Sequence, residues 1–169
     1  MTGHAVVTGA SRGIGLAIAE ALVEAGYHVL GTATTQAGAD QFSQRMAGQG
    51  QGYALNLGDQ SSIDAFTAAI KADHDAPLIL VNNAGIGVGG ALLDVPLEEF
   101  SHVIEINLMG VVHGCYAFLP RMRDAGHPAV VVNMLSSSGF CALPGVTSYK
   151  PCHVGVRGSV MRWCLYQYL

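Results

Sequence analysis

Thr8–Gly15 reads TGASRGIG, directly after the apolar run His4–Thr8 and ahead of a stretch whose apolar residues recur at helical spacing as far as Gly26. This arrangement predicts a strand, a tight turn and a helix. Glycine lets the backbone turn sharply and lets a ligand approach, while a helix start offers free N–H groups and the positive end of a dipole. The stretch therefore predicts a phosphate-binding cradle. A glycine-rich turn without a ligand is the alternative, since the spacing differs from the commoner Gly-x-Gly-x-x-Gly.

Short apolar runs alternate with amphipathic stretches along the rest of the chain, the pattern of strand–helix units repeated around a parallel sheet. The predicted strands are His4–Thr8, His28–Thr32, Gly52–Leu55, Leu78–Val81 and Ala129–Asn133. The predicted helices are Ile14–Ala25, Ala37–Ala47, Ser61–Ala72, Leu97–Met122 and a last one from about Ser148 to the C-terminus. Residues 1–169 are expected to form a single α/β domain, a Rossmann-type, doubly wound parallel sheet.

The composition excludes several classes of protein. The 169 residues carry 8 Lys and Arg against 12 Asp and Glu, a formal charge of −4, and 50% are hydrophobic. Such a chain is not disordered and is long enough to bury a sizeable core. It shows no basic block, no apolar run of about 20 residues and no secretory leader. The four cysteines have no paired spacing and predict free thiols without a metal site. We expect a cytoplasmic protein with neither nucleic acid nor a membrane as partner.

The residues after the second predicted strand indicate which nucleotide the cradle would take. Gly31–Thr35 reads GTATT and contains no Asp or Glu that could bind a pair of ribose hydroxyls. Arg12 supplies a cation and Thr34 a hydroxyl for a 2′-phosphate, which favours NADP(H) over NAD(H). The alternative is that Arg12 is a solvated residue at a helix start, although a positive charge is unfavourable there.

Further motifs follow the fourth and fifth predicted strands. Asn82–Gly85 reads NNAG, Asn107 lies between Ile and Leu, Ser136–Gly139 reads SSSG, and Tyr149 comes thirteen residues after the first of these serines. With the glycine-rich turn, this set resembles the short-chain dehydrogenase/reductase family over essentially the whole chain. The first half is most similar to the 3-oxoacyl-[acyl-carrier-protein] reductases, whereas Gly114–Met122 is more similar to other branches. Each motif alone also fits a loop, a helix cap or a packing residue, but the order and spacing of the set favour the resemblance.

The resemblance implies a nicotinamide-dependent carbonyl reductase and assigns roles to its motifs. The implied cofactor-binding residues are Gly9, Ala10, Ser11, Arg12, Gly13, Ile14, Gly15, Thr34, Asn56, Leu57, Asn83, Ala84, Gly85, Tyr149 and His153. The glycine-rich turn would wrap the phosphates, Asn56 and Leu57 would flank the adenine, and residues 83–85 would lie by the nicotinamide and its ribose. In catalysis, Ser136 would hold the substrate carbonyl oxygen, Tyr149 would protonate it, and Asn107 would position a water in the proton relay.

The fourth residue after Tyr149 departs from the family pattern, because it is His153 where the family has a catalytic lysine. That lysine binds the nicotinamide ribose, and at about 4–5 Å and an effective dielectric near 20 its charge stabilises an ionised tyrosine by roughly 3–4 kcal/mol. A neutral histidine supplies a hydrogen bond but little of this field. Lys150 lies about 100° away around the helix and is no substitute, and Pro151 fits only in the first helical turn. Catalysis is therefore expected to be weakened.

Length is the second departure, because members of the family continue well beyond the Tyr149 helix. The chain is expected to lack the last strands of the family fold and most of the substrate pocket. Its fifth strand would then be an uncovered edge, which invites pairing with another chain. In the family the last helix and the long helix before it build a dimer interface, so the resemblance also implies a homo-oligomer here.

Three functions remain open on the sequence alone. The first is an NADPH-dependent reductase that acts on a small-molecule or acyl-thioester carbonyl. The second is a nucleotide-binding pseudoenzyme, which would bind the cofactor without turnover. The third is a truncated product without a selected function, which would be loosely packed and would self-associate. The missing lysine and the missing substrate region motivate the last two.

Overall fold

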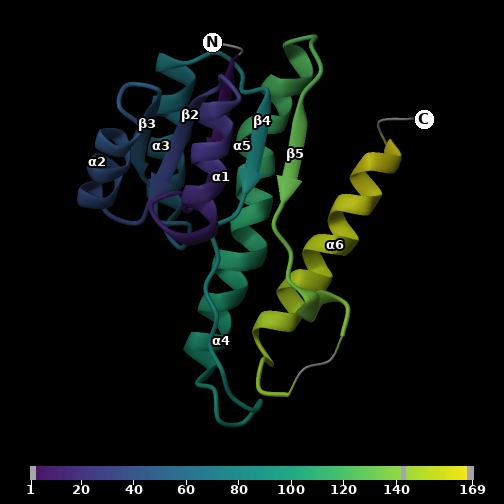
Figure 1. The fold of residues 1–169 in the computed structure, drawn as a ribbon. Coiled ribbons are helices and arrows are strands. Elements are labelled where there is room, and N and C mark those ends of the chain that lie inside the picture. The colour runs from purple at the N-terminus through teal and green to yellow at the C-terminus, as the bar shows by residue number, and fades with distance from the viewer. Residues whose placement is uncertain (1–2, 142–143, 167–169) are drawn as a thin grey trace.

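The computed structural model describes residues 3–141 and 144–166, with backbone only from residue 160 onward. Its strands are β1 (His4–Val7), β2 (His28–Ala33), β3 (Gly50–Ala54), β4 (Ile79–Asn82) and β5 (Val130–Asn133). Its helices are α1 (Gly13–Glu24), α2 (Gln36–Arg45), α3 (Gln60–Asp73), α4 (Leu97–Ile104), α5 (Gly110–Asp124) and α6 (Tyr149–Tyr166) (Figure 1). The predicted strands begin and end within two residues of the observed ones.

The five strands form one parallel sheet in the order β3-β2-β1-β4-β5. The chain builds outward from β1 to β3 on one side and then returns to continue through β4 and β5 on the other. This change of direction between β1 and β4 is the topological switch point, and ligands of open α/β sheets bind there, outside the carboxyl ends of the strands. The doubly wound parallel sheet predicted from the sequence is confirmed.

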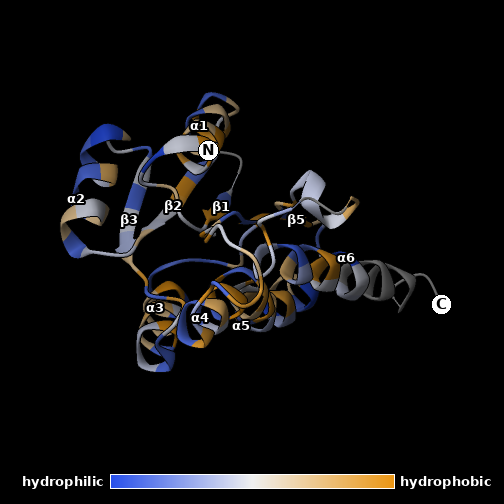
Figure 2. Cartoon of the chain, turned by 90° about the horizontal axis from the view of Figure 1, so that it is seen from below, coloured by the Kyte–Doolittle hydropathy of each residue, from blue (hydrophilic) through white to orange (hydrophobic). Residues whose placement is uncertain are grey.

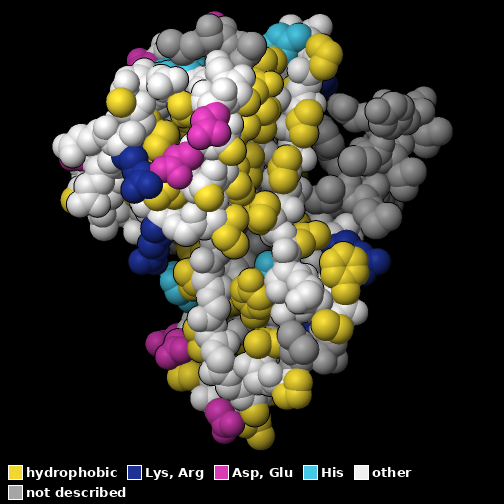
Figure 3. Space-filling model, viewed as in Figure 1, with side chains coloured by type: hydrophobic (Ala, Val, Ile, Leu, Met, Phe, Trp, Pro, Cys, Tyr) yellow, Lys and Arg dark blue, Asp and Glu magenta, His cyan; other side chains and the backbone are white. Residues whose placement is uncertain are grey.

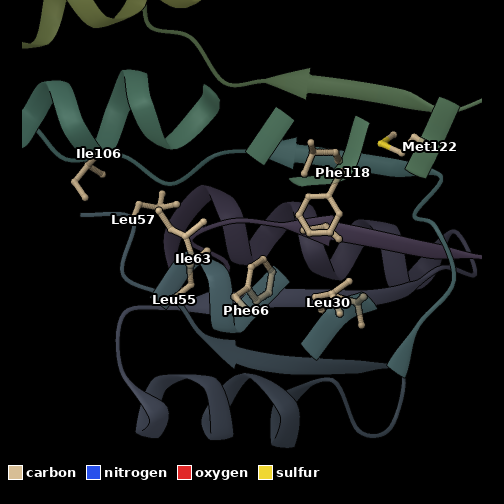
Figure 4. Close-up of a cluster of buried hydrophobic side chains, with 11 residues drawn as sticks. Leu30, Leu55, Leu57, Ile63, Phe66, Ile106, Phe118 and Met122 are labelled. Atoms are coloured by element: carbon tan, nitrogen blue, oxygen red, sulfur yellow. The ribbon is translucent and has the colours of Figure 1, made fainter. Parts of the chain in front are cut away.

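Helices cover both faces of the sheet, as a parallel sheet with apolar strands requires. α1 and α2 lie on one face, and α3 and α5 lie on the other (Figure 2). Each layer has its own cluster of buried side chains. The α1–α2 layer is built around Ala5, Val7, Ala10, Ala19, Val29, Phe42, Met46 and Val81. The opposite layer contains Val6, Leu30, Leu55, Leu57, Ile63, Phe66, Ile70, Leu80, Ile106, Phe118 and Met122 (Figure 4).

The single helix predicted over Leu97–Met122 is interrupted. A π-helical turn, Glu105–Met109, separates α4 from α5. The interruption contains Asn107, whose buried side chain is hydrogen-bonded to the backbone of Ile86. Turns of this kind occur often at functional sites, and apolar spacing alone does not reveal them.

The same segment, Leu97–Asp124, is long and apolar enough by composition to cross a membrane. The sequence contains no unbroken apolar run of about 20 residues, so this segment was not predicted as a candidate membrane span. Val103, Ile106 and Phe118 are nevertheless buried within the domain, and a core helix passes the same test. The finding is weak evidence for a membrane span.

β5 pairs with β4 and has no second neighbour among the strands of the described residues. Val130 is 56% exposed and Val132 40% exposed, as expected of strand residues without a covering layer. Hydrophobic side chains gather in a column over the β4 and β5 region in Figure 3. An uncovered fifth strand was predicted from the sequence.

The thiols predicted to be free are free where their side chains are described. These are Cys115, Cys141 and Cys152, whereas Cys164 lies outside the described side chains. Within the described residues, no group of three or more His, Cys, Asp or Glu side chains is arranged to hold a metal ion.

Three histidines meet at the amino ends of the central strands, opposite the switch point. His4 and His28 are directly paired in the β1–β2 register. The ring of His74, which follows α3, lies 5.0 Å from that of His4 and 6.2 Å from that of His28. Tyr53 contacts His74 Nε2 through its hydroxyl at 2.6 Å. Burial, and then the neighbouring imidazoles, lower the pKa of both His28 and His74, against a smaller opposing effect of Asp73 on His74.

We expect this cluster to make the fold acid-sensitive. In the unfolded chain these histidines are protonated at their ordinary pKa of about 6.5, whereas in the folded chain their pKa values are lower. The free energy of unfolding is therefore highest above about pH 6.5 and decreases as the pH falls from there through the pKa values of the folded state. Urea unfolding between pH 7.5 and 5 should show the midpoint falling, and His28→Phe should flatten the dependence. Replacement of the exposed His127 by Gln should leave it unchanged. A wild-type midpoint that is constant over this range would contradict the expectation.

Candidate functional site

The glycine-rich turn lies at the carboxyl end of β1 and is tied to the neighbouring strand. The N–H of Gly9 donates to the Thr32 hydroxyl at 3.0 Å, and the N–H of Ala10 donates to the Thr32 carbonyl at 2.8 Å. Gly9 and Gly13 have φ values of +66° and +57°, which side chains rarely adopt. The turn is thereby bent back so that α1 begins at the switch point.

The start of α1 is open. Its N-cap residue, Arg12, makes no capping hydrogen bond through its side chain, and the first turn holds no acidic residue. The N–H groups of Gly13, Ile14 and Gly15 therefore have no partner within the helix. A Cβ added to Gly13 would meet nothing within 4 Å, and the side chain of Ile14 is 66% exposed. This geometry can accept an anion, with the helix dipole favouring it.

The other two glycines of the turn allow close packing. A Cβ on Gly15 would collide with the Gly9 carbonyl oxygen and with Nδ2 of Asn83, and a Cβ on Gly9 would lie 2.9 Å from Cα of Ala84. Gly9 and Gly15 therefore hold the turn against the segment after β4, while Gly13 leaves the space above the helix start empty.

The segment after β4 is fastened to the turn by hydrogen bonds. The Thr8 hydroxyl accepts the N–H groups of Asn83 and Ala84, each at 3.0 Å. Nδ2 of Asn83 donates to the carbonyls of Thr8 and Gly9, at 3.0 and 3.2 Å. The predicted cofactor residue Asn83 thus uses its amide nitrogen to shape the cradle. The hydroxyls of Thr8 and Thr32 were not predicted as part of the site, although each lies at the end of a predicted strand.

Thr34 and Ser11 are both exposed and lie near the start of α2. Thr35 caps this helix by accepting the N–H of Gly38, and a Cβ on Gly38 would lie 4.0 Å from Cβ of Ser11. Neither an acidic residue in the first turn of α2 nor an ion pair of Arg12 is found among the described residues. Of the two residues predicted to bind a 2′-phosphate, Thr34 therefore lies near the exposed start of α2, whereas Arg12 is exposed at the N-cap of α1 and is paired with no carboxylate of the described residues.

The two residues predicted to flank the adenine lie after β3 and differ in their environment. Asn56 is exposed and accepts the N–H of Gly58 through its side-chain oxygen at 3.1 Å. Leu57 is only 7% exposed and packs in the core beside Gly110. Because its side chain is packed in the core, only the backbone of Leu57 is available to a ligand at this edge of the sheet.

Asn107 joins the π-helical turn to the loop after β4. Its Oδ1 accepts the N–H of Ile86 at 2.8 Å, and its Nδ2 donates to the Ile86 carbonyl at 2.7 Å. A Cβ on Gly85 would lie 3.4 Å from Asn107 Oδ1. Because the side chain is engaged in this way, it holds the loop, and the predicted relay water would need the backbone as its ligand.

Ser136, Tyr149 and His153 are brought together where β5 is followed by a short 3₁₀ turn and α6. The hydroxyl of Ser136 accepts the N–H of Ser138 at 3.2 Å. The rings of Tyr149 and His153 lie one turn apart on α6, with centroids 4.3 Å apart. The backbone N–H of Ser136 donates to His153 Nδ1 at 3.4 Å.

The loop after β4 completes this constellation. The N–H of Gly90 donates to the Gly145 carbonyl at 2.8 Å, and the Thr147 hydroxyl donates to the Gly90 carbonyl at 3.1 Å. A Cβ on Gly87 would lie 3.8 Å from the Tyr149 ring. Residues 83–90 therefore contact the glycine-rich turn at one end and approach Tyr149 at the other. This loop connects the residues predicted to bind phosphate with the residues predicted to act in catalysis.

His153 is buried, and its burial alone accounts for the shift of its pKa. It is 8% exposed, and burial lowers the pKa of its imidazole. Pro151 is the third residue of α6, so no hydrogen bond of the helix is lost to it. The site therefore has a neutral group at the position where the resemblance leads one to expect a cation.

Known proteins match this chain over nearly its whole length. A family model described as short chain dehydrogenase matches residues 3–165. The 3-oxoacyl-[acyl-carrier-protein] reductase FabG of Haemophilus influenzae is 39% identical over 154 residues, which cover 91% of this chain and 63% of that protein. The Probable oxidoreductase EphD of Mycobacterium tuberculosis is 36% identical over 146 residues, 85% of this chain and 25% of that protein.

A solved structure is also similar to this chain in its three-dimensional fold. A metagenomic short-chain oxidoreductase in complex with NADP superposes with a TM-score of 0.88 at 32% identity, over 95% of this chain and 74% of that one. The present chain spans less than two thirds of the length of the curated relatives named above.

Proposed function

This chain belongs to the short chain dehydrogenase family, and from that membership we propose that it binds NADP(H) at the start of α1 and transfers hydride between the nicotinamide and a carbonyl carbon. The observation that carries the proposal is the open helix start, where the N–H groups of residues 13–15 have no capping side chain and Gly13 borders empty space. A pyrophosphate fits these donors in both charge and shape. The NADP-bound neighbour supports the choice of nucleotide.

The residues of the site divide between holding the nucleotide and handling a proton. Residues 9–15 would hold the phosphates, Asn56 and the Leu57 backbone would border the adenine, and residues 83–85 would border the nicotinamide side. The bound nicotinamide supplies the hydride. Tyr149 would donate the proton to the substrate oxygen, and Ser136 would fix that oxygen beside it. The substrate class that this chemistry admits is a small-molecule or acyl-thioester carbonyl.

Turnover is expected to be low. His153 is neutral in its buried position, so the electrostatic stabilisation that a cation gives to an ionised tyrosine is missing. The same observation favours a second candidate function, a protein that binds NADP(H) without turning it over. Carbonyl-dependent oxidation of NADPH distinguishes the two, because only the reductase consumes the nucleotide.

The exposed side of the cradle indicates a preference for NADPH over NADH. Arg12 is exposed at the N-cap of α1 and Thr34 is exposed just before α2, and no carboxylate of the described residues is paired with Arg12. A guanidinium donates two parallel hydrogen bonds to a phosphate, which makes arginine well suited to a 2′-phosphate.

We expect Arg12→Ala to weaken NADPH binding by about tenfold or more, because the variant loses the charge-assisted hydrogen bonds that the guanidinium would donate to the 2′-phosphate. NADH affinity should change less than about twofold, because NADH has no 2′-phosphate. Fluorescence titration of both nucleotides gives the two constants, and Arg123→Ala, at an exposed arginine near the end of α5, is the matched control. Equal weakening of NADPH and NADH would exclude a contact between Arg12 and the 2′-phosphate.

We also propose that copies of the chain associate through α5 and α6. Tyr116 on α5 is 82% exposed and Val154 on α6 is 47% exposed, both unusually open positions for large apolar side chains. Burial of these residues in a homo-oligomer would remove that surface from water.

A further inference from the structure

A second serine lies against the hydroxyl of Ser136. Ser138 is only 4% exposed, and its hydroxyl oxygen lies 3.2 Å from Oγ of Ser136. Its backbone N–H donates to the same Oγ, also at 3.2 Å. Ser137, between these two residues, is exposed. Of the three consecutive serines, the first and the third are therefore joined through their side chains.

The short 3₁₀ turn holds this pair of hydroxyls in place. The N–H of Gly139 donates to the Ser136 carbonyl at 3.0 Å, and the N–H of Phe140 donates to the Ser137 carbonyl at 2.9 Å. A Cβ on Gly139 would lie 3.1 Å from Cβ of His153, so the turn is packed closely against α6. Because the turn is fixed on both sides, the hydroxyl of Ser138 is held beside that of Ser136.

The burial of Ser138 favours one direction for the bond between the two hydroxyls. Either oxygen can supply the hydrogen, because hydroxyl hydrogens rotate. If Ser136 donated, the hydroxyl hydrogen of Ser138 would be buried without an acceptor among the described residues, which is costly. Ser136 is only half-buried, so its own hydrogen can reach water or a ligand. The favoured arrangement is therefore the one in which Ser138 donates to Ser136.

We infer that Ser138 is a positioning residue whose hydroxyl donates to Oγ of Ser136 and leaves the hydrogen of Ser136 free for the carbonyl oxygen of the substrate. The N–H and the O–H of Ser138 together occupy both lone pairs of that Oγ. Ser136 then meets a ligand only as a donor, and a hydroxyl that accepts hydrogen bonds is polarised and donates more strongly. The role at the substrate rests on the proposed function, whereas the direction of the bond concerns the chain alone.

Substitutions at two neighbouring serines test the role at the substrate. Ser138→Ala removes the buried hydroxyl and keeps the backbone N–H. We expect kcat/KM for a 3-oxoacyl thioester to fall about fivefold, the effect of one neutral hydrogen bond. NADPH affinity, measured by fluorescence titration, should be unchanged. Ser138→Thr retains the hydroxyl and should keep most of the rate, and Ser137→Ala, at the exposed neighbour, is the matched control that should change neither quantity.

The direction of the bond can be measured without substrate. In a mixture of H₂O and D₂O, a hydroxyl whose hydrogen exchanges slowly gives two resolved ¹³C signals for its Cβ. We expect such a pair of signals for Ser138 in the unaltered chain. In Ser136→Ala the acceptor is missing, so exchange of the Ser138 hydroxyl should become about tenfold faster.

The outcomes that overturn the inference are distinct from failure of the proposed function. Unchanged kcat/KM in Ser138→Ala would show that the hydroxyl does not assist Ser136, and an equal loss in Ser138→Thr would attribute the effect to packing. Hydroxyl exchange at Ser138 that is the same in Ser136→Ala would show that Ser138 does not donate to Ser136. Absence of carbonyl-dependent turnover by the unaltered chain would refute the reductase and the role at the substrate together, while hydroxyl exchange would still decide the direction of the bond.

Discussion

Gly15→Ala is expected to abolish measurable NADPH binding and to destabilise the fold. The added methyl group would collide with the Gly9 carbonyl and with the Asn83 amide, both of which are fixed by other hydrogen bonds of the turn. Overpacking of this kind costs about 1–3 kcal/mol, and more when backbone cannot move aside. Relief of the collision would separate α1 from the segment after β4 and displace the N–H groups that would hold the phosphates. Urea unfolding and nucleotide titration measure the two effects.

Two further glycines make this test specific. Gly158→Ala, on α6 with nothing within 4 Å of the added Cβ, should be neutral or slightly stabilising, by up to about 1 kcal/mol. Gly13→Ala meets no atom but has a φ of +57°, so it should cost about 1–2 kcal/mol and leave the fold intact. Its methyl group would still occupy the space above the helix start, and NADPH affinity should fall. Unchanged nucleotide affinity in both Gly13→Ala and Gly15→Ala would refute the proposed cradle.

Tyr149→Phe is expected to reduce carbonyl-dependent NADPH oxidation by about 10²-fold or more, the usual contribution of a general acid. The change removes one hydroxyl and keeps the ring that packs on His153. NADPH affinity and unfolding should therefore change little. Steady-state consumption of NADPH with a 3-oxoacyl thioester provides the measurement, and Tyr27→Phe, at a tyrosine just before β2 and outside the site, is the control.

Turnover that survives Tyr149→Phe would exclude the tyrosine as proton donor.

A second variant tests why turnover by the unaltered chain is expected to be low. His153→Lys restores a positive charge beside Tyr149, and a charge at about 4–5 Å stabilises an ionised tyrosine by roughly 3–4 kcal/mol at an effective dielectric near 20. Turnover should rise, whereas an unchanged rate would place the defect outside this pair of residues.

The sequence predicts the architecture well because burial on both faces leaves a strong pattern. The apolar runs of β1, β2 and β4, and the stripe of α1 that ends at Gly26, correspond to the observed elements. The π-helical turn between α4 and α5 was not predicted, because it depends on the hydrogen bonds that Asn107 makes to Ile86, a residue in a distant part of the sequence.

The location of the candidate site can be predicted from the sequence, whereas the contacts that each of its side chains makes are harder to predict. Residues that follow the strands meet at one edge because parallel strands end there together, so Asn83 and Ser136 could be placed in advance. The engagement of Asn83 with the carbonyls of Thr8 and Gly9, and the burial of Leu57, follow from packing that the sequence does not reveal. The same holds for the acceptor role of His153, since only the folded chain brings the Ser136 amide to its ring.

The central claim is that a nicotinamide dinucleotide binds at the open start of α1. Its most direct test is a ¹H–¹⁵N titration of the unaltered chain with NADPH, followed amide by amide. We predict saturable shifts that are largest at Gly13, Ile14 and Gly15, whose N–H groups have no partner within the helix. No saturable change, or changes confined to residues away from this turn and the segment after β4, would contradict the account.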